Sequence, residues 1–103
     1  MSRPVNRMPA VHPGEILQED FLVPLGMSAN ALSRALRIPA PRINDVLLER
    51  RGITTDTALR LARFFNTTPQ FWLNLQASFD LRRTEVAVGD KIEREIHPIN
   101  TTG

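Results

Sequence analysis

The sequence predicts an all-α fold of five helices, and three observations support this class. Apolar residues recur at the three- and four-residue spacing of a helix face through most of the chain. Good N-capping residues precede these segments, and proline or glycine lies near their ends. No alternating apolar pattern of strand length is present. With 103 residues, 42% of them hydrophobic and 23% charged, the chain has the size and composition of one globular domain.

The first helix is predicted to begin at His12 and Pro13. Proline suits the first helical position, and Glu15 then lies near the positive end of the helix dipole, so His12 is interpreted as a helix-start residue and not as a ligand. We expect Pro24 and Gly26 to end this helix. Its apolar face comprises Ile16, Leu17, Phe21 and Leu22. Residues 1–11 contain two prolines and no periodicity, which predicts a flexible N-terminal arm.

The second helix is predicted to follow Ser28, a good N-cap, and to be short. A tight connection at residues 37–39 leads to a third helix, which runs from Ala40 to about Arg50, with Gly52 as its stop signal. The apolar residues are Leu32, Ala35 and Leu36 in the second helix and Ile43, Val46 and Leu47 in the third.

The last two helices are predicted from threonine caps. Thr54 or Thr55 caps the fourth helix, and Thr68 with Pro69 opens the fifth. The fifth helix extends to about Val88, and the charged stretch after Gly89 adds a turn or two. The fourth helix has Leu59, Leu61, Ala62 and Phe65 as its apolar set, and the fifth has Phe71, Trp72, Leu75 and Phe79. These aromatic residues suit a base-stacking platform or a core, and their helical spacing favours the core.

The second and third helices meet the physical requirement for entering the DNA major groove. In a helix-turn-helix the first helix braces the second, whose N-terminal residues then face the base edges. The small side chain of Ser33 lets the two helices pass closely. The residues expected to bury the inner faces are Leu32, Leu36, Ile38, Ile43 and Val46. Ordinary helical hairpins show the same spacing, so the pattern alone supports either interpretation.

Positive charge is concentrated in the middle of the chain. The net charge is +2, and twelve of the thirteen basic residues are arginine. Residues 27–65 carry a net +4, whereas residues 1–26 and 66–103 each carry −1. This distribution is expected of a surface that meets phosphates, although a solvated helical face has a similar composition.

Four segments resemble the short helix-turn-helix antitoxins of the HigA type, within the larger Xre/Cro repressor-like superfamily. They are HPGEIL at 12–17, PLGMSANALSRAL at 24–36, RRGITTDTALRLARFF at 50–65 and TPQFWLNLQASFDL at 68–81. The resemblance implies a lambda-repressor-like helix-turn-helix domain over residues 12–81, followed by a C-terminal helical extension and tail over 82–103. It also implies the antitoxin of a type II toxin-antitoxin system, which represses its own operon and neutralises a RelE- or HigB-like mRNA-cleaving toxin.

The chain departs from the superfamily pattern at two places. Arg37 stands where the turn usually has a glycine with positive φ, and a non-glycine residue in that conformation costs about 1 kcal/mol. The third helix begins with Pro39, Ala40 and Pro41, where related repressors often have Ser, Gln or Thr, so its first turn offers few hydrogen bonds to bases.

The candidate base contacts are Ala40, Pro41, Arg42, Asn44 and Asp45. Arg42 can bond bidentately to guanine and Asn44 to adenine. Ala40 can touch a thymine methyl group, and Asp45 can accept from cytosine N4 or hold Arg42 in place. Each of these side chains also suits a solvated helix surface.

Candidate phosphate contacts are Ser28, at a helix N-terminus, and Arg50 and Arg51, just past the third helix. The alternative is a solvated charged loop. We expect a homodimer that binds an inverted repeat in double-stranded operator DNA, because one helix covers only a few base pairs. The dimer is predicted to form through the segment after Thr68, with ion pairs from residues 90–96.

Toxin binding is predicted at the N-terminal arm together with an acidic face of the first helix. Glu15, Glu19 and Asp20 are suitable partners for a basic RNA-cutting enzyme, and a solvated acidic face is the alternative. The assignment depends on the resemblance. A stand-alone helix-turn-helix transcriptional regulator without a toxin partner, or a module that kept the fold without binding DNA, remains the alternative function.

Several function classes lack support in the sequence. There is no cysteine, the two histidines are far apart, and no Ser/His/Asp grouping or glycine-rich phosphate loop is present. We therefore expect no metal, no cofactor and no enzymatic activity. No apolar run is long enough to span a bilayer, and the N-terminus lacks a signal-peptide pattern, which predicts a cytoplasmic protein.

Overall fold

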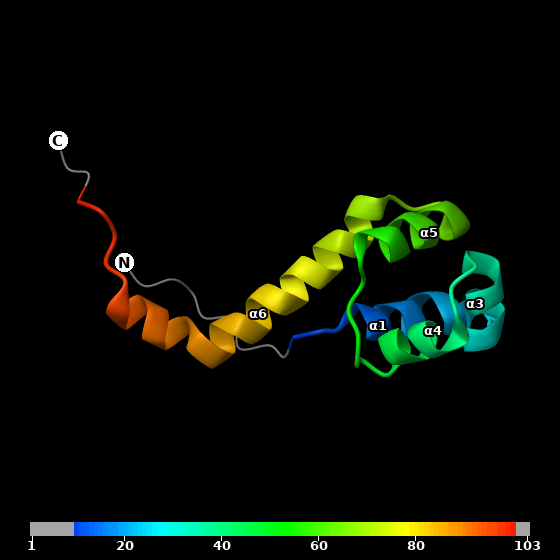
Figure 1. The fold of residues 1–103 in the computed structure, drawn as a ribbon, viewed down its shortest axis with the longest axis horizontal. Helices are drawn as coiled ribbons and strands as arrows, with labels where there is room; N and C mark the ends of the chain where they lie inside the picture. The colour runs from blue at the N-terminus through cyan, green and yellow to red at the C-terminus, as the bar shows by residue number, and fades with distance from the viewer. Residues whose placement is uncertain (1–9, 101–103) are drawn as a thin grey trace.

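The computed structural model describes residues 10–100, so most of the predicted N-terminal arm lies outside the described residues. All regular secondary structure in the described chain is helical, and its five helices follow the predicted order (Figure 1). The first helix consists of three consecutive elements, α1 (Pro13–Ile16), η1 (Leu17–Leu22) and α2 (Val23–Leu25). The other four are α3 (Ala29–Leu36), α4 (Ala40–Leu47), α5 (Thr55–Phe65) and α6 (Pro69–Glu95).

The first helix begins where the sequence predicts. Of the two residues expected to end it, Pro24 and Gly26, only Gly26 does so. His12 is its N-cap, and the Nδ1 atom of His12 accepts a hydrogen bond from the Gly14 amide at 2.8 Å. Pro24 does not end the helix, because the preceding turns of η1 are π-helical and α2 continues through Pro24. A proline nitrogen has no hydrogen to donate. The π-helical hydrogen bonds before Pro24, which join residues five apart, let the helix tolerate that loss. The helix ends at Gly26, with φ 60°.

The third predicted helix, α4, is shorter than expected. It ends at Leu47 and not near Arg50, because Glu49 adopts a left-handed conformation with φ 63°. The backbone amides of Arg50 and Arg51 then both donate to the carbonyl of Asp45, at 2.8 and 3.2 Å. Gly52 therefore lies beyond the end of the helix.

Gly52 has a different role from that of a helix stop. A Cβ atom at Gly52 would lie 2.7 Å from the Oε1 atom of Gln76. That oxygen accepts a hydrogen bond from the Ile53 amide at 2.6 Å. The absence of a side chain at Gly52 thus lets Gln76 of α6 reach the loop before α5.

Helix α6 begins after its predicted N-cap Thr68. Helix α5 begins after Thr54, which is one of the two threonines that the sequence offers as its cap. Helix α6 continues through Gly89 to Glu95 as one 27-residue helix, and its second half extends away from the other helices (Figure 1). The boundary predicted at Leu81 therefore falls inside a continuous helix. No helix in the described part of the chain is long and apolar enough to cross a membrane.

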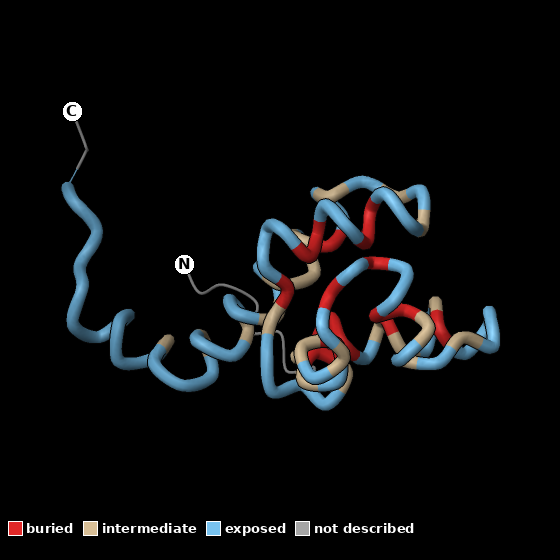
Figure 2. The backbone as a smooth tube through the Cα atoms, turned by 45° about the vertical axis from the view of Figure 1, so that its right-hand side comes forward, coloured by how far each residue is buried: buried red, intermediate tan, exposed pale blue. Residues whose placement is uncertain are grey.

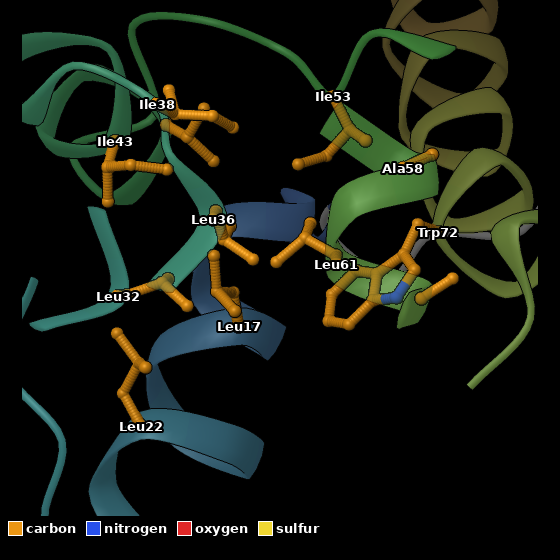
Figure 3. Close-up of a cluster of buried hydrophobic side chains, with 12 residues drawn as sticks. Leu17, Leu22, Leu32, Leu36, Ile38, Ile43, Ile53, Ala58, Leu61 and Trp72 are labelled. Carbon is orange, nitrogen blue, oxygen red and sulfur yellow. The ribbon is translucent and has the colours of Figure 1, made fainter. Parts of the chain in front are cut away.

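The core lies between the first helix, α3, α4, α5 and the start of α6. Its twelve buried apolar residues are Leu17, Leu22, Leu32, Leu36, Ile38, Ile43, Val46, Ile53, Ala58, Leu61, Ala62 and Trp72. Leu17, Leu36 and Leu61 meet in the middle of this cluster (Figure 3). The buried positions end at Trp72, and the rest of α6 is half-buried or exposed (Figure 2).

Trp72 closes the core on the side of α6. Its side chain is fully buried, and its Nε1 atom donates to the hydroxyl of Thr67 at 2.8 Å. The ring of Phe21 packs against Trp72 with 4.9 Å between centroids, and Phe79 packs edge-on against His12 at 4.8 Å. Phe71 is 37% exposed and lies at the rim. The core interpretation thus holds fully for Trp72 and in part for the other two aromatic residues of α6.

Candidate nucleic-acid interface

The turn between α3 and α4 has the geometry of a helix-turn-helix. Arg37 is the C-cap of α3 in the left-handed conformation, with φ 56° and ψ 43°. The buried hydroxyl of Ser33 donates to the carbonyl of Ile38, and the Ile38 amide donates back to the Ser33 carbonyl at 3.1 Å. Ser33 therefore stabilises the turn in addition to letting the helices pass closely. The strained position predicted at Arg37 is confirmed.

The side of α4 that faces away from the core carries polar side chains and a proline. Ile43 and Val46 are buried, whereas Pro41 and Asn44 are exposed. Ala40 and Asp45 are half-buried. The helix starts after Pro39, which makes no side-chain cap, so the first turn offers few side-chain hydrogen bonds, as the sequence indicates.

Arg42 does not point freely outward with these residues. Its Nη2 atom donates to the hydroxyls of Thr54 and Thr57, at 3.1 and 2.9 Å, and lies 3.8 Å from a carboxylate oxygen of Asp56. These partners belong to the start of α5, so Arg42 links α4 to α5. In this structure the guanidinium group is engaged with α5, and the base contact stays a prediction.

The candidate phosphate contacts lie at the ends of α3 and α4. The Ser28 hydroxyl accepts from the Ala31 amide at 3.0 Å, which leaves its own hydrogen for another acceptor. Arg50 and Arg51 are both exposed in the turn that closes α4. Since their backbone amides bind the end of α4, the positions of these two arginines are tied to those of the exposed α4 residues.

The acidic residues proposed for toxin binding are all exposed. Glu15 is in α1, and Glu19 and Asp20 are in the π-helical segment η1. Val23 and Leu25 follow on the same helix, with exposed fractions of 57% and 63%. The first helix therefore presents an acidic half and an apolar half to solvent.

Sequence reasoning missed the residues that connect α5 to the turn. The Nε atom of Arg60 donates to a carboxylate oxygen of Asp56 at 2.8 Å, and its Nη1 atom donates to the carbonyl of Leu36 at 2.9 Å. The four-residue spacing of Asp56 and Arg60 on one helix face was a signal for the first contact. The described residues contain no group of three or more His, Asp or Glu side chains that could hold a metal ion.

The paired helices, the left-handed turn and the outward surface of α4 define a helix-turn-helix protein. A model of the helix-turn-helix family matches residues 19–72, which is more than half of the chain. Virulence-associated protein I of Dichelobacter nodosus is 55% identical over 80 residues, which span 78% of this chain and 74% of that protein.

Two solved antitoxin structures share the fold. Pseudomonas aeruginosa antitoxin HigA, solved with the higBA promoter, gives a TM-score of 0.86 at 48% identity and covers 87% of this chain and 98% of its own. The antitoxin GraA in complex with its operator gives a TM-score of 0.87 at 47% identity, over 94% and 98% of the two chains. The chain belongs to the HigA-type family of helix-turn-helix antitoxins.

Proposed function

We propose that this chain is an antitoxin that binds operator DNA as a transcriptional autorepressor and neutralises a RelE- or HigB-like mRNA-cleaving toxin. The observation that carries the DNA-binding part is the exposed surface of α4, held by a left-handed turn against α3. The complexes of the HigA and GraA antitoxins with promoter and operator DNA support this assignment, since they share the fold at nearly half identity.

Base contacts are assigned to the exposed side of α4. Asn44 pairs with adenine, Asp45 accepts from cytosine N4, and Ala40 and Pro41 provide apolar contacts such as a thymine methyl group. Ser28, Arg50 and Arg51 contact phosphates, which sets the register on the duplex and carries no sequence information.

DNA binding is tested by titrating the parent protein against its own promoter and against random duplex at several salt concentrations. Asn44→Ala is expected to weaken promoter binding and leave random binding unchanged. Arg50→Ala with Arg51→Ala is expected to weaken both equally and to reduce the salt slope by up to about 2, because two phosphate contacts are lost. Equal affinity of the parent for promoter and random DNA would refute the specific-repressor assignment.

A homodimer through α6 places two recognition helices on an inverted repeat. Leu81, Val88 and Ile92 are exposed by 63%, 37% and 51%, and their spacing of seven and four residues puts them on one face of the extending half of α6. Val86 is 80% exposed and lies off this face, because residues two apart do not face each other.

The dimer interface is tested with charged substitutions and light scattering. Val88→Lys with Ile92→Lys is expected to give monomers, whereas Val86→Lys keeps the dimer, because only the first pair places charge inside the apolar contact. A dimer that survives both changes would place the interface elsewhere.

Neutralisation is assigned to the acidic face of the first helix, which is separate in sequence from α4. Electrostatic complementarity to a basic ribonuclease favours Glu15, Glu19 and Asp20 as the contacting residues. Their joint replacement by lysine, in cells that co-express the neighbouring toxin, is expected to restore toxicity while operator binding stays intact. Full protection by the triple variant would exclude this face. If no short ribonuclease-like reading frame adjoins the gene, the stand-alone regulator becomes the function.

A further inference from the structure

Three charged side chains from two helices, α4 and α5, form a network around the Asp56 carboxylate. Asp56 lies in the first turn of α5, and Arg60 lies one turn later, with 2.8 Å between the Arg60 Nε atom and the Asp56 carboxylate. Arg42 of α4 lies 3.8 Å from the same carboxylate oxygen. We call these three side chains the Asp56 network. It connects the start of the recognition helix to α5.

The Asp56 network also reaches the turn itself. Arg60 donates from Nη1 to the carbonyl of Leu36 at 2.9 Å and to that of Arg37 at 3.4 Å. These carbonyls lie at the C-terminal end of α3, where helices leave acceptors unpaired and where a positive charge is favourable. Arg60 thus caps α3 from another helix, at the residue where the turn carries Arg37 in place of glycine.

The contacts of Arg42 with α5 leave one of its donors unsatisfied. Its Nε atom is buried and has no hydrogen-bond acceptor among the described residues. Its Nη2 atom already donates to the hydroxyls of Thr54 and Thr57. A planar guanidinium group held on one side in this way does not also form a bidentate pair with a base edge.

We propose that Arg42, Asp56 and Arg60 are positioning residues that set the orientation of α4 against α3 and α5, so that operator discrimination depends on side chains that do not touch DNA. The inference rests on the proposed function, because α4 has to be the helix that contacts bases. Asp56 and Arg60 are 57% and 41% exposed at their side chains, so their pairing contributes little to stability and acts mainly on geometry.

The test compares variants of Asp56 and Arg60 with a matched control. Asp56→Asn and Arg60→Gln break the network, whereas Arg63→Gln removes the same charge as Arg60→Gln from a nearby exposed position of α5. The ratio of operator to random-DNA affinity is expected to fall about tenfold in the first two variants, which is the discrimination that one well-placed base contact supplies. In Arg63→Gln the ratio stays at the parent value.

The sign of the Asp56→Asn effect separates positioning from simple electrostatics. Loss of a negative charge near the DNA surface strengthens binding to every sequence, so a purely electrostatic role would raise both affinities and keep their ratio. A positioning role lowers the ratio even as random binding rises. Asp56→Glu keeps the carboxylate and is expected to restore most of the ratio.

Thermal unfolding of each variant shows whether a change in DNA binding is caused by a folding defect. The melting temperature is expected to shift by no more than a few degrees in Asp56→Asn. If Arg60→Gln proves too unstable to assay, it is combined with Arg37→Gly in a double variant. The glycine relieves the left-handed strain at the turn and so raises stability, but it does not restore the link to Asp56. An unchanged ratio in both network variants, with a parent protein that discriminates, would overturn the inference. A parent that does not discriminate would instead overturn the proposed function.

Discussion

Gly14 lies where the first helix crosses α4, and a methyl group at this position would collide with the backbone of α4. An ideal Cβ atom at Gly14 would lie 2.0 Å from the carbonyl oxygen of Val46 and 3.0 Å from its carbonyl carbon. The Gly14 amide also donates to the His12 side chain, which holds the start of the helix in place. Gly14→Ala therefore forces the first helix and α4 apart.

The magnitude follows from two opposing terms. Alanine in place of helical glycine gains about 0.5–1 kcal/mol from backbone entropy. Overpacking a closed site costs about 1–3 kcal/mol, and the upper end applies here because the partner is backbone and cannot rotate away. The contact has to lengthen by about 1 Å, a shift that a close-packed core resists. The net loss is about 2 kcal/mol, or about 8–16 °C in melting temperature for a domain of this size.

Urea unfolding at equilibrium measures this loss, and Gly89→Ala is the matched control. Gly89 is also helical, but its nearest neighbour would be the Glu85 Cβ at 3.8 Å, an ordinary contact. Gly89→Ala is therefore expected to be neutral or to stabilise by up to about 1 kcal/mol. If Gly14→Ala were as stable as the parent, the close approach of the first helix to α4 would be wrong.

Three further changes test separate parts of the fold. Arg37→Gly is expected to stabilise the protein by about 1 kcal/mol in urea unfolding, because it relieves a positive φ, and a loss would argue against the left-handed turn. Trp72→Ala is expected to cost about 3–5 kcal/mol in the same assay, since the ring is fully buried, and a cost below about 1 kcal/mol would contradict that burial. Burial lowers the pKa of His12 below 6.5, against the opposing charges of Glu49 and Asp80. The folded protein thus disfavours protonated His12, so the stability that this residue contributes is present above pH 6.5 and is lost as the pH falls from 6.5 toward the lower folded pKa. His12→Asn keeps a capping side chain that does not titrate, and its stability should decline less steeply with falling pH over this range; equal slopes would count against the mechanism.

The helices and their start signals could be predicted from local chemistry. His12, Ser28 and Thr68 each cap the helix that the sequence assigns to them, because capping needs only a side-chain acceptor and amides two or three residues away. For α5 the sequence leaves Thr54 and Thr55 open, and the structure has Thr54 as the cap. The left-handed position at Arg37 could also be expected, since the resemblance places a glycine there. The helix ends were harder to predict than the starts. The first helix continues through Pro24, and α4 ends at Leu47, before Arg50, because the backbone hydrogen bonds of neighbouring residues decide both ends.

In the candidate site, too, some features follow from the sequence and others depend on the tertiary structure. The sequence by itself determined the paired helices and which α4 residues, such as Asn44, lie away from the core, because helical periodicity separates a buried face from an exposed one. It did not determine the direction of Arg42, a long side chain that can reach several partners. Only the tertiary structure brings Thr54, Asp56 and Thr57 beside it, because the loop after α4 returns the start of α5 to the start of α4. Contacts of this kind depend on how separate helices pack, and periodicity within one helix carries no information about them.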